Sequence, residues 1–380
     1  MAKTIETFIL PPSSPGQSRT LTAIRYGAVS GEGPKAYIQA GLHADEAPGL
    51  VVMHHLIDRL DRLEESGGII GEIILVPAAN PIGLSQWRDE KILGRFEFFS
   101  NINFNRRHLD ILEPLAGKIG DRLTDDPRAN TALIRQAARE VLASLSPGDE
   151  ADALKHRLLT WACDADIVLD LHCDFQALIH VYLGTPLWPD AADLSAQMGA
   201  QATFLAEASG GSPFDEACSA VWWRLAEKFP DKPIPPACLA ATVELRGQHD
   251  VSHELASRDA ENIVLFLQRR GLIGGRAPEA PPLPREATPL TAMAAVKATK
   301  PGVTVFLKKP GDWVEQGEII AEIINPLGDD ARERVHPVEA TTAGLLFALA
   351  PDRYARPGRT LAKIAGRIPL KKEGENLLEL

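Results

Sequence analysis

The chain contains few cysteines, and none of them forms a metal-binding pair. Four cysteines occur among 380 residues, and no two of them are spaced as Cys-x-x-Cys. The spacing therefore disfavours a cysteine-type zinc site, and a disulfide framework is not expected. Sparse, scattered cysteines are typical of a reducing compartment, so we expect a cytoplasmic protein.

Long apolar runs and positive charge are also lacking. No stretch of 18 apolar residues occurs, and the first residues do not combine a basic segment with an apolar one, so neither a membrane span nor a signal peptide is predicted. The net charge of −11 disfavours binding to nucleic acids and anionic membranes. An anionic small molecule is not excluded, because a local arginine cluster can invert the potential in one cleft. Oligomeric state is left open, a homo-oligomer included.

Apolar periodicity predicts alternating strands and helices over the first 275 residues. Residues 20–27, 35–41 and 69–77 have the pattern of strands, and helical spacing begins at Pro48. Further strands are expected at 166–171, 177–183 and 238–245, and further helices at 129–145, 151–163, 190–201, 215–228 and 254–270, whereas 80–107 has the pattern of an ordered loop region. This order predicts an α/β domain, with a mixed, mostly parallel sheet and helices on both faces.

The composition changes after residue 275. Residues 276–289 contain five prolines and predict a stiff linker. Short strand-like runs broken by glycine follow at 290–380, so we expect a small C-terminal all-β domain, a sandwich or barrel.

The segment from Gly41 to Glu46 holds the first candidate metal ligands. His43 and Glu46 are three residues apart, between an expected strand end and a helix, where both side chains can reach one ion. Ligands of open α/β sheets bind at such strand ends. The motif alone is weak, since Glu46 would also be favoured simply by the helix dipole.

A second strand end carries Asp170, His172 and Asp174. His172 would complete a His, Glu, His set, the pattern of a catalytic zinc site with water in the fourth position. Asp170 or Asp174 could orient an imidazole from behind. The alternative is a histidine satisfied by a backbone carbonyl.

Two further segments carry candidate groups for substrate and catalysis. In the expected loop, Asn105 and Arg106 could hold a carboxylate, although tandem arginines are often a solvated pair. Glu244 lies near the end of an apolar strand, where an unpaired carboxylate is costly, so we expect it to face a polar cleft as a general base. The alternative is an ion pair with Arg246.

These four motifs together, in this chain order, resemble the zinc carboxypeptidase-like hydrolases over roughly residues 35–270. The closest likeness is to the succinylglutamate desuccinylase/aspartoacylase family of deacylases, whose members carry a small β domain after the catalytic one. The resemblance implies one Zn²⁺ per chain on His43, Glu46 and His172, with Glu244 as the catalytic glutamate.

The resemblance also implies substrate contacts. Asn105 and Arg106 match the pair that grips the substrate carboxylate. An upstream arginine polarises the scissile carbonyl, and either Arg88, by its spacing before Asn105, or Arg95, which we favour slightly, matches it. The classical carboxypeptidase tyrosine has no clear match, and Tyr354 of the C-terminal domain is a candidate to reach the cleft.

The C-terminal domain resembles a lipoyl-type fold without its carrier lysine, because no lysine occurs between Glu322 and Gly344. We therefore expect a structural cap or substrate gate. The function implied is zinc-dependent hydrolysis of the amide bond of a small N-acyl amino acid or related N-acyl amine. The alternatives are a metallocarboxypeptidase acting on short peptides and a non-enzymatic small-molecule binding protein on the same fold.

Overall fold

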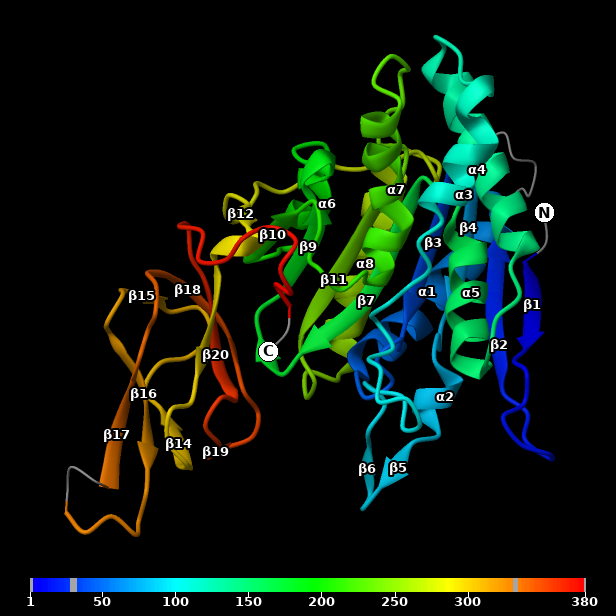
Figure 1. The fold of residues 1–380 in the computed structure, drawn as a ribbon. Helices are drawn as coiled ribbons and strands as arrows, with labels where there is room; N and C mark the ends of the chain where they lie inside the picture. Colours follow the sequence, from blue (N-terminus) through cyan, green and yellow to red (C-terminus); the bar gives the residue numbers. More distant parts are fainter. Residues whose placement is uncertain (1–2, 28–32, 331–333, 379–380) are drawn as a thin grey trace.

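The computed structural model describes residues 3–27, 33–330 and 334–378, and a large sheet dominates it (Figure 1). In spatial order its strands are β1 (Thr4–Ile9), β2 (Thr20–Tyr26), β4 (Glu72–Val76), β3 (Lys35–Ala40), β7 (Ile167–Asp174), β11 (Leu239–Gly247), β9 (His180–Gly184), β10 (Ala202–Ala206) and β12 (Thr288–Pro289). Strands β4, β3, β7 and β11 run parallel, while β1, β2 and β9 introduce antiparallel pairs. The predicted mixed, mostly parallel sheet is confirmed.

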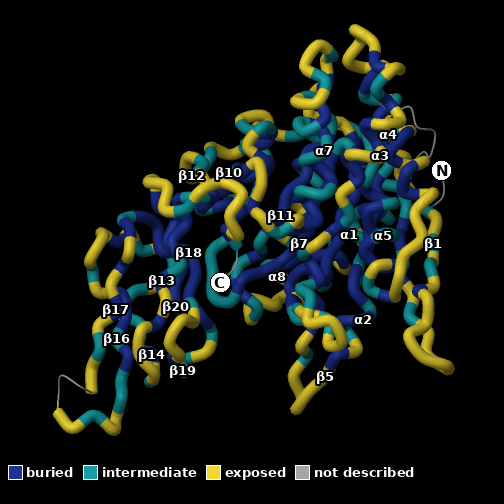
Figure 2. Tube along the Cα trace, in the orientation of Figure 1, coloured by how far each residue is buried: buried dark blue, intermediate teal, exposed yellow. Residues whose placement is uncertain are grey.

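Helices cover both faces of this sheet, as expected. One face packs on α1 (Pro48–Glu65), α6 (Ala192–Met198) and α8 (His253–Arg269), and the other on α3 (Leu112–Ile119), α4 (Pro127–Ser144), α5 (Glu150–Ala162) and α7 (Phe214–Lys228). Alternation along β3 explains the two cores, because Tyr37 lies in one and Ile38 in the other. Figure 2 shows these strands buried between the helix layers.

Residues 80–107 are mostly irregular, as predicted, with only α2 (Pro81–Leu84), β5 (Trp87–Arg88) and β6 (Lys91–Ile92) inside them. A 3₁₀ turn, η1 (Gly120–Arg122), follows α3, and a second, η2 (Thr185–Leu187), follows β9. Elements β1, α3 and β10 were not expected from the sequence.

The C-terminal domain is a sandwich of two antiparallel sheets, which confirms the predicted all-β class. One sheet has β13 (Met293–Lys297), β20 (Thr360–Ala365), β18 (Gly344–Leu349) and β15 (Trp313–Val314). The other has β17 (Val335–Glu339), β16 (Ile319–Ile324), β14 (Gly302–Phe306) and β19 (Tyr354–Ala355), and η3 (Leu290–Ala292) leads into the domain. Apolar side chains of both sheets, among them Val314, Ile320 and Ile364, form their common core.

The two domains are joined by more than the linker. Strand β8 (Gln176–Ala177), which directly follows β7, pairs with β18 and so extends the C-terminal sheet. Arg353 donates a hydrogen bond to Gln176 Oε1 at 3.0 Å, and Phe347 packs against His180. The domain boundaries at 275 and 289 remain a prediction, but Thr288 and Pro289 at the end of the expected linker pair with β10. Within the described residues, no helix combines the length and apolar character needed to cross a bilayer.

Candidate metal and substrate site

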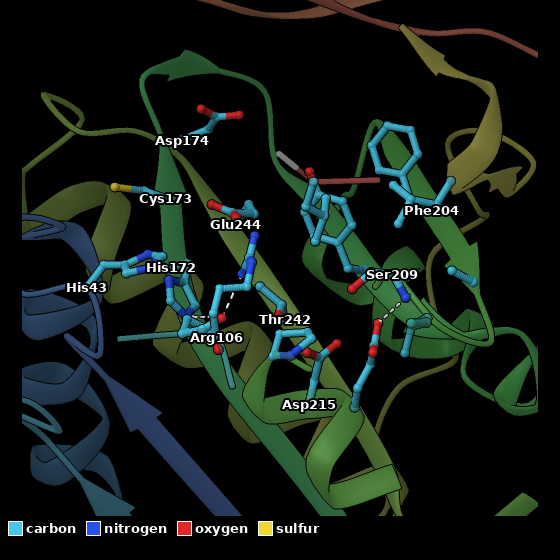
Figure 3. Close-up of a pocket in the computed structure, with 18 of the residues that line it drawn as sticks. His43, Arg106, His172, Cys173, Asp174, Phe204, Ser209, Asp215, Thr242 and Glu244 are labelled. Atoms are coloured by element: carbon cyan, nitrogen blue, oxygen red, sulfur yellow. Dashed lines mark hydrogen bonds between the residues drawn. The ribbon is translucent and has the colours of Figure 1, made fainter. Parts of the chain in front are cut away.

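Three predicted metal ligands converge at the carboxyl ends of β3 and β7. His43 and Glu46 lie in the turn between β3 and α1, and His172 lies on β7; the three residues are at most 4 % exposed. One ligand atom from each lies within 4.8 Å of the others, and among the described residues this is the one such group that could hold a metal. Figure 3 shows His43 and His172 side by side at the edge of the cavity.

The side-chain contacts orient each imidazole toward the shared carboxylate. Nδ1 of His43 lies 3.0 Å from Glu46 Oε1, and Nδ1 of His172 lies 2.9 Å from Glu46 Oε2. The opposite ring nitrogens also have oxygen partners. Nε2 of His43 lies 2.7 Å from Asn103 Oδ1, and Nε2 of His172 lies 2.9 Å from Asp170 Oδ2. Oxygen contacts behind the ring are typical of metal-binding histidines, so this donor set fits Zn²⁺.

The protonation preferences of the two imidazoles differ. Burial, with the nearby charge of Arg95, lowers the pKa of His43 to about 4, so this imidazole is neutral at pH 7. Burial also acts to lower the pKa of His172, but the charges of Asp170 and Glu46 outweigh it and hold this pKa well above its usual range. A metal ion would take the place of the proton between Glu46 and His172.

Glu244 faces the same cavity, as the sequence predicted. In the register of the sheet it lies between His172 on β7 and His180 on β9. Its Oε2 is buried and has no hydrogen-bond partner among the described residues. Burial and the charge of Glu46 raise its pKa to about 8. A carboxyl group titrating near neutrality can both accept and return a proton.

The alternative ion pair between Glu244 and Arg246 is not formed. The pairing of β11 with β7 is irregular between Glu244 and Gly247, and Arg246 has a φ of 65°. The irregularity turns the Arg246 side chain away to Asp259 on α8, with which it forms an ion pair.

The structure separates the two competing upstream arginines. Arg95 lines the cavity and donates a hydrogen bond from Nη2 to Glu46 Oε1 at 2.7 Å. Arg88 instead lies on the exposed β5–β6 hairpin, 5.6 Å from the centre of the Phe98 ring, and borders a different pocket with Phe96 and Phe98. Only Arg95 is brought to the candidate metal ligands.

Asn105 and Arg106 also line the cavity. Asn105 Oδ1 accepts a hydrogen bond from the Phe214 N–H at 2.8 Å, and its Nδ2 lies 3.3 Å from His172 Nε2, so its amide is largely engaged within the protein. Arg106 reaches over Gly211, where an added Cβ would come within 2.5 Å of the arginine Cδ. Its Nη1 donates a hydrogen bond to Asn105 O at 2.7 Å.

Several residues that line the cavity were not anticipated, and Lys363 and Tyr182 are two of them. Lys363 of β20 is buried and places Nζ 2.5 Å from Asp174 Oδ2, so the C-terminal domain contributes a cation to the wall of the cavity. Tyr182 of β9 is the second, while the candidate Tyr354 is 73 % exposed and is not among the residues lining the cavity. In the sequence, both Lys363 and Tyr182 sit inside apolar strand-like runs, and a polar residue there is the only local signal.

Comparisons with known proteins agree with this geometry. Residues 32–269 match the sequence model of the succinylglutamate desuccinylase/aspartoacylase catalytic domain. The chain belongs to this family. No curated protein matches the chain.

Solved structures share the fold over nearly the whole chain. A protein from Shewanella frigidimarina NCIMB 400, described as a succinylglutamate desuccinylase/aspartoacylase, is 22 % identical with a TM-score of 0.84, and the match covers 96 % of this chain and 97 % of that one. A protein of the same family description from Shewanella amazonensis SB2B is 25 % identical with a TM-score of 0.80, over 95 % and 98 % of the two chains. The product-bound ectoine utilization protein EutE (DoeB) from Ruegeria pomeroyi is 16 % identical with a TM-score of 0.63, over 96 % and 95 %. The C-terminal domain is therefore part of the shared fold.

Proposed function

We propose that the protein is a zinc-dependent hydrolase that cleaves the amide bond of a small N-acyl amino acid or related N-acyl amine. The observation that carries the proposal is the cluster of His43, Glu46 and His172, whose two histidines line the same cavity as Glu244 with its Oε2, unpartnered among the described residues. We favour an enzyme over a binding protein on the same fold because this Oε2 of Glu244 lies beside the candidate metal ligands, where a general base is needed.

The chain supplies the groups that amide hydrolysis needs. Zinc, when held by His43, Glu46 and His172, would supply Lewis acidity and make water acidic enough to react near neutral pH. Glu244 takes a proton from the attacking water at Oε2 and delivers it to the departing amine nitrogen. Arg95 donates hydrogen bonds to the carbonyl oxygen as negative charge develops on it.

Arg106 orients the substrate. Its guanidinium holds the substrate carboxylate through two parallel N–H···O hydrogen bonds, which fixes the scissile amide relative to Glu244. Asn105 supports this arrangement mainly by fixing the loop, since its side chain bridges the Phe214 N–H and His172.

The proposal is tested by metal analysis combined with a substrate panel. We expect about one zinc per purified chain, loss of hydrolysis of N-acyl amino acids after chelation, and recovery on adding zinc, each followed by mass spectrometry. Release of C-terminal residues from short peptides in place of deacylation would support the metallocarboxypeptidase alternative. Absence of bound zinc, with no hydrolysis after zinc is added, would refute the proposal.

A further inference from the structure

The 371–378 segment, which follows the C-terminal domain, lies against the 207–212 loop between β10 and α7 (Figure 1). Three hydrogen bonds link the segment to the loop. The N–H groups of Leu377 and Gly374 donate to Ser209 O at 2.9 Å and Ala208 O at 3.3 Å, and the Glu207 N–H donates to Glu373 Oε1 at 2.6 Å. Two of these bonds join backbone to backbone, so the path of the loop depends on the path of the segment.

One leucine anchors the segment. Leu377 is 1 % exposed and packs in an apolar cluster with Phe204 of β10, Leu290 of η3 and Phe347 of β18. The preceding residues 373–376 are exposed. Because burial of a leucine side chain is favourable and its exposed neighbours bury little, the position of the segment depends on Leu377.

The loop approaches the segment closely at Gly210. This glycine has a φ of 86°, and a Cβ added to it would lie 2.5 Å from Glu375 O. Such a φ strongly favours glycine, and the short distance leaves no room for a side chain between the two backbones. A displacement of the segment is therefore transmitted directly to the loop.

The same loop also supports Arg106. The backbone oxygens of Gly211 and Ser212 accept hydrogen bonds from the N–H groups of Arg107 at 3.0 Å and His108 at 3.1 Å. Gly211 lies directly against the Arg106 side chain, since a Cβ added to the glycine would come within 2.5 Å of the arginine Cδ. Figure 3 shows Arg106 among the residues that surround the cavity. The loop thus connects Leu377 to the arginine proposed to hold the substrate carboxylate.

We propose that the 371–378 segment positions Arg106 through the 207–212 loop, and that Leu377 is the positioning residue. The inference rests on the proposed function for the role of Arg106. Without the Leu377 anchor the loop moves, and the guanidinium is no longer fixed relative to the substrate carboxylate. The metal ligands and Glu244 belong to other elements, so the loss falls on substrate binding, which raises KM and leaves kcat unchanged.

Leu377→Ala tests the proposal with a matched pair of substrates. The pair is the N-acyl amino acid hydrolysed fastest in the panel above and its carboxamide, which lacks the negative charge. We expect wild-type kcat/KM to favour the carboxylate by roughly tenfold to a hundredfold, the range of a charge-assisted hydrogen bond. Leu377→Ala should raise KM for the carboxylate roughly threefold to tenfold, while kcat changes by less than about twofold, and should lower the preference by the same factor.

Two further variants complete the test. Asn376→Ala, at the exposed neighbour of Leu377, is the control and should leave the preference for the carboxylate unchanged. If Leu377→Ala does not fold, judged by thermal unfolding, the exposed Glu373 replaces it: Glu373→Ala removes the acceptor of the Glu207 N–H and should lower the preference in the same direction. A lower Tm with an unchanged preference in the variant that folds shows a purely structural role and overturns the inference.

Hydrogen exchange separates this inference from the proposed function, because it does not depend on activity. Deuterium uptake of peptides covering the 207–212 loop should rise in Leu377→Ala and stay unchanged in Asn376→Ala. Unchanged uptake and an unchanged preference, in a protein that hydrolyses N-acyl amino acids, refute the inference and support the deacylase. Increased uptake in a protein that hydrolyses no N-acyl substrate supports the link between segment and loop and refutes the deacylase.

Discussion

The ion pair between Lys363 and Asp174 joins the C-terminal domain to the candidate site, and Lys363→Met tests its importance. The two charged atoms lie 2.5 Å apart, and the side chains are only 9 % and 6 % exposed. At an effective dielectric constant near 20, two unit charges at this distance attract by roughly 6–7 kcal/mol. Desolvation offsets part of this, so removing one partner of a buried pair costs roughly 3–5 kcal/mol.

The cost can be converted into a melting temperature. An unfolding entropy of about 2.1 cal/mol/K per residue gives roughly 0.8 kcal/mol/K for 380 residues. Lys363→Met should therefore lower Tm by about 4–6 °C when both domains unfold together, as measured by calorimetry. Lys300→Met, at an exposed lysine of the same domain, is the matched control and should shift Tm by less than about 1 °C.

The double variant Lys363→Met with Asp174→Asn completes the test. Because Asp174→Asn removes the buried carboxylate that Lys363→Met leaves without a cation, the double variant should be more stable than Lys363→Met alone. If Lys363→Met has the same Tm as the Lys300→Met control, and adding Asp174→Asn does not raise that Tm, this ion pair does not hold the domains together.

Three further predictions concern catalysis and pH. Glu244→Gln should lower kcat by roughly 10²–10⁴-fold while metal analysis finds unchanged zinc; activity near the wild-type level would remove Glu244 from the proton transfer. In steady-state assays, Arg95→Met should lower kcat by roughly 10²–10³-fold, whereas Arg88→Met should lower it by less than about twofold. The reverse order would show that Arg88, and not Arg95, polarises the scissile carbonyl. Burial lowers the pKa of His180 to about 4 in the folded protein. As the pH falls from 6.5 to about 4, His180 becomes protonated in the unfolded state but stays neutral in the folded state, so the protein loses stability over this range. His180→Gln should remove roughly 3 kcal/mol of this loss in denaturant titrations of the metal-free protein, and an unchanged pH slope would contradict the assignment.

The features predicted correctly are those encoded locally. Helix α1 follows from apolar spacing behind Pro48, and buried strands such as β7 follow from continuous apolar runs. Candidate ligands at strand ends could be grouped because parallel strands present their carboxyl ends at one edge of the sheet. The metal ligands and Glu244 were placed together on this basis, whereas Arg106 was assigned by the family resemblance. His43, His172, Glu244 and Arg106 line one cavity, and Glu46 lies with the two histidines.

The missed elements lack such local patterns. Helix α3 contains Pro114 and Gly117, which disfavour a helix, and it is held by the buried Leu115 and Ile119. Strand β1 is an edge strand whose side chains are exposed or half-buried, so its pattern is weak. The choice between Arg88 and Arg95 could not be made from spacing, because it depends on the β5–β6 hairpin carrying Arg88 away from the cavity.

Strand β7 shows why the site depends on both domains. Side chains alternate along a strand, so Asp170, His172 and Asp174 lie on the same face, and each has a different partner. Asp170 lies behind His172, His172 faces Glu46, and Asp174 binds Lys363 of the C-terminal domain. A shift of the C-terminal domain would therefore act on the same strand that positions the candidate metal ligand, two residues away. We infer that the C-terminal domain, through Lys363, helps to fix the geometry of this edge of the sheet.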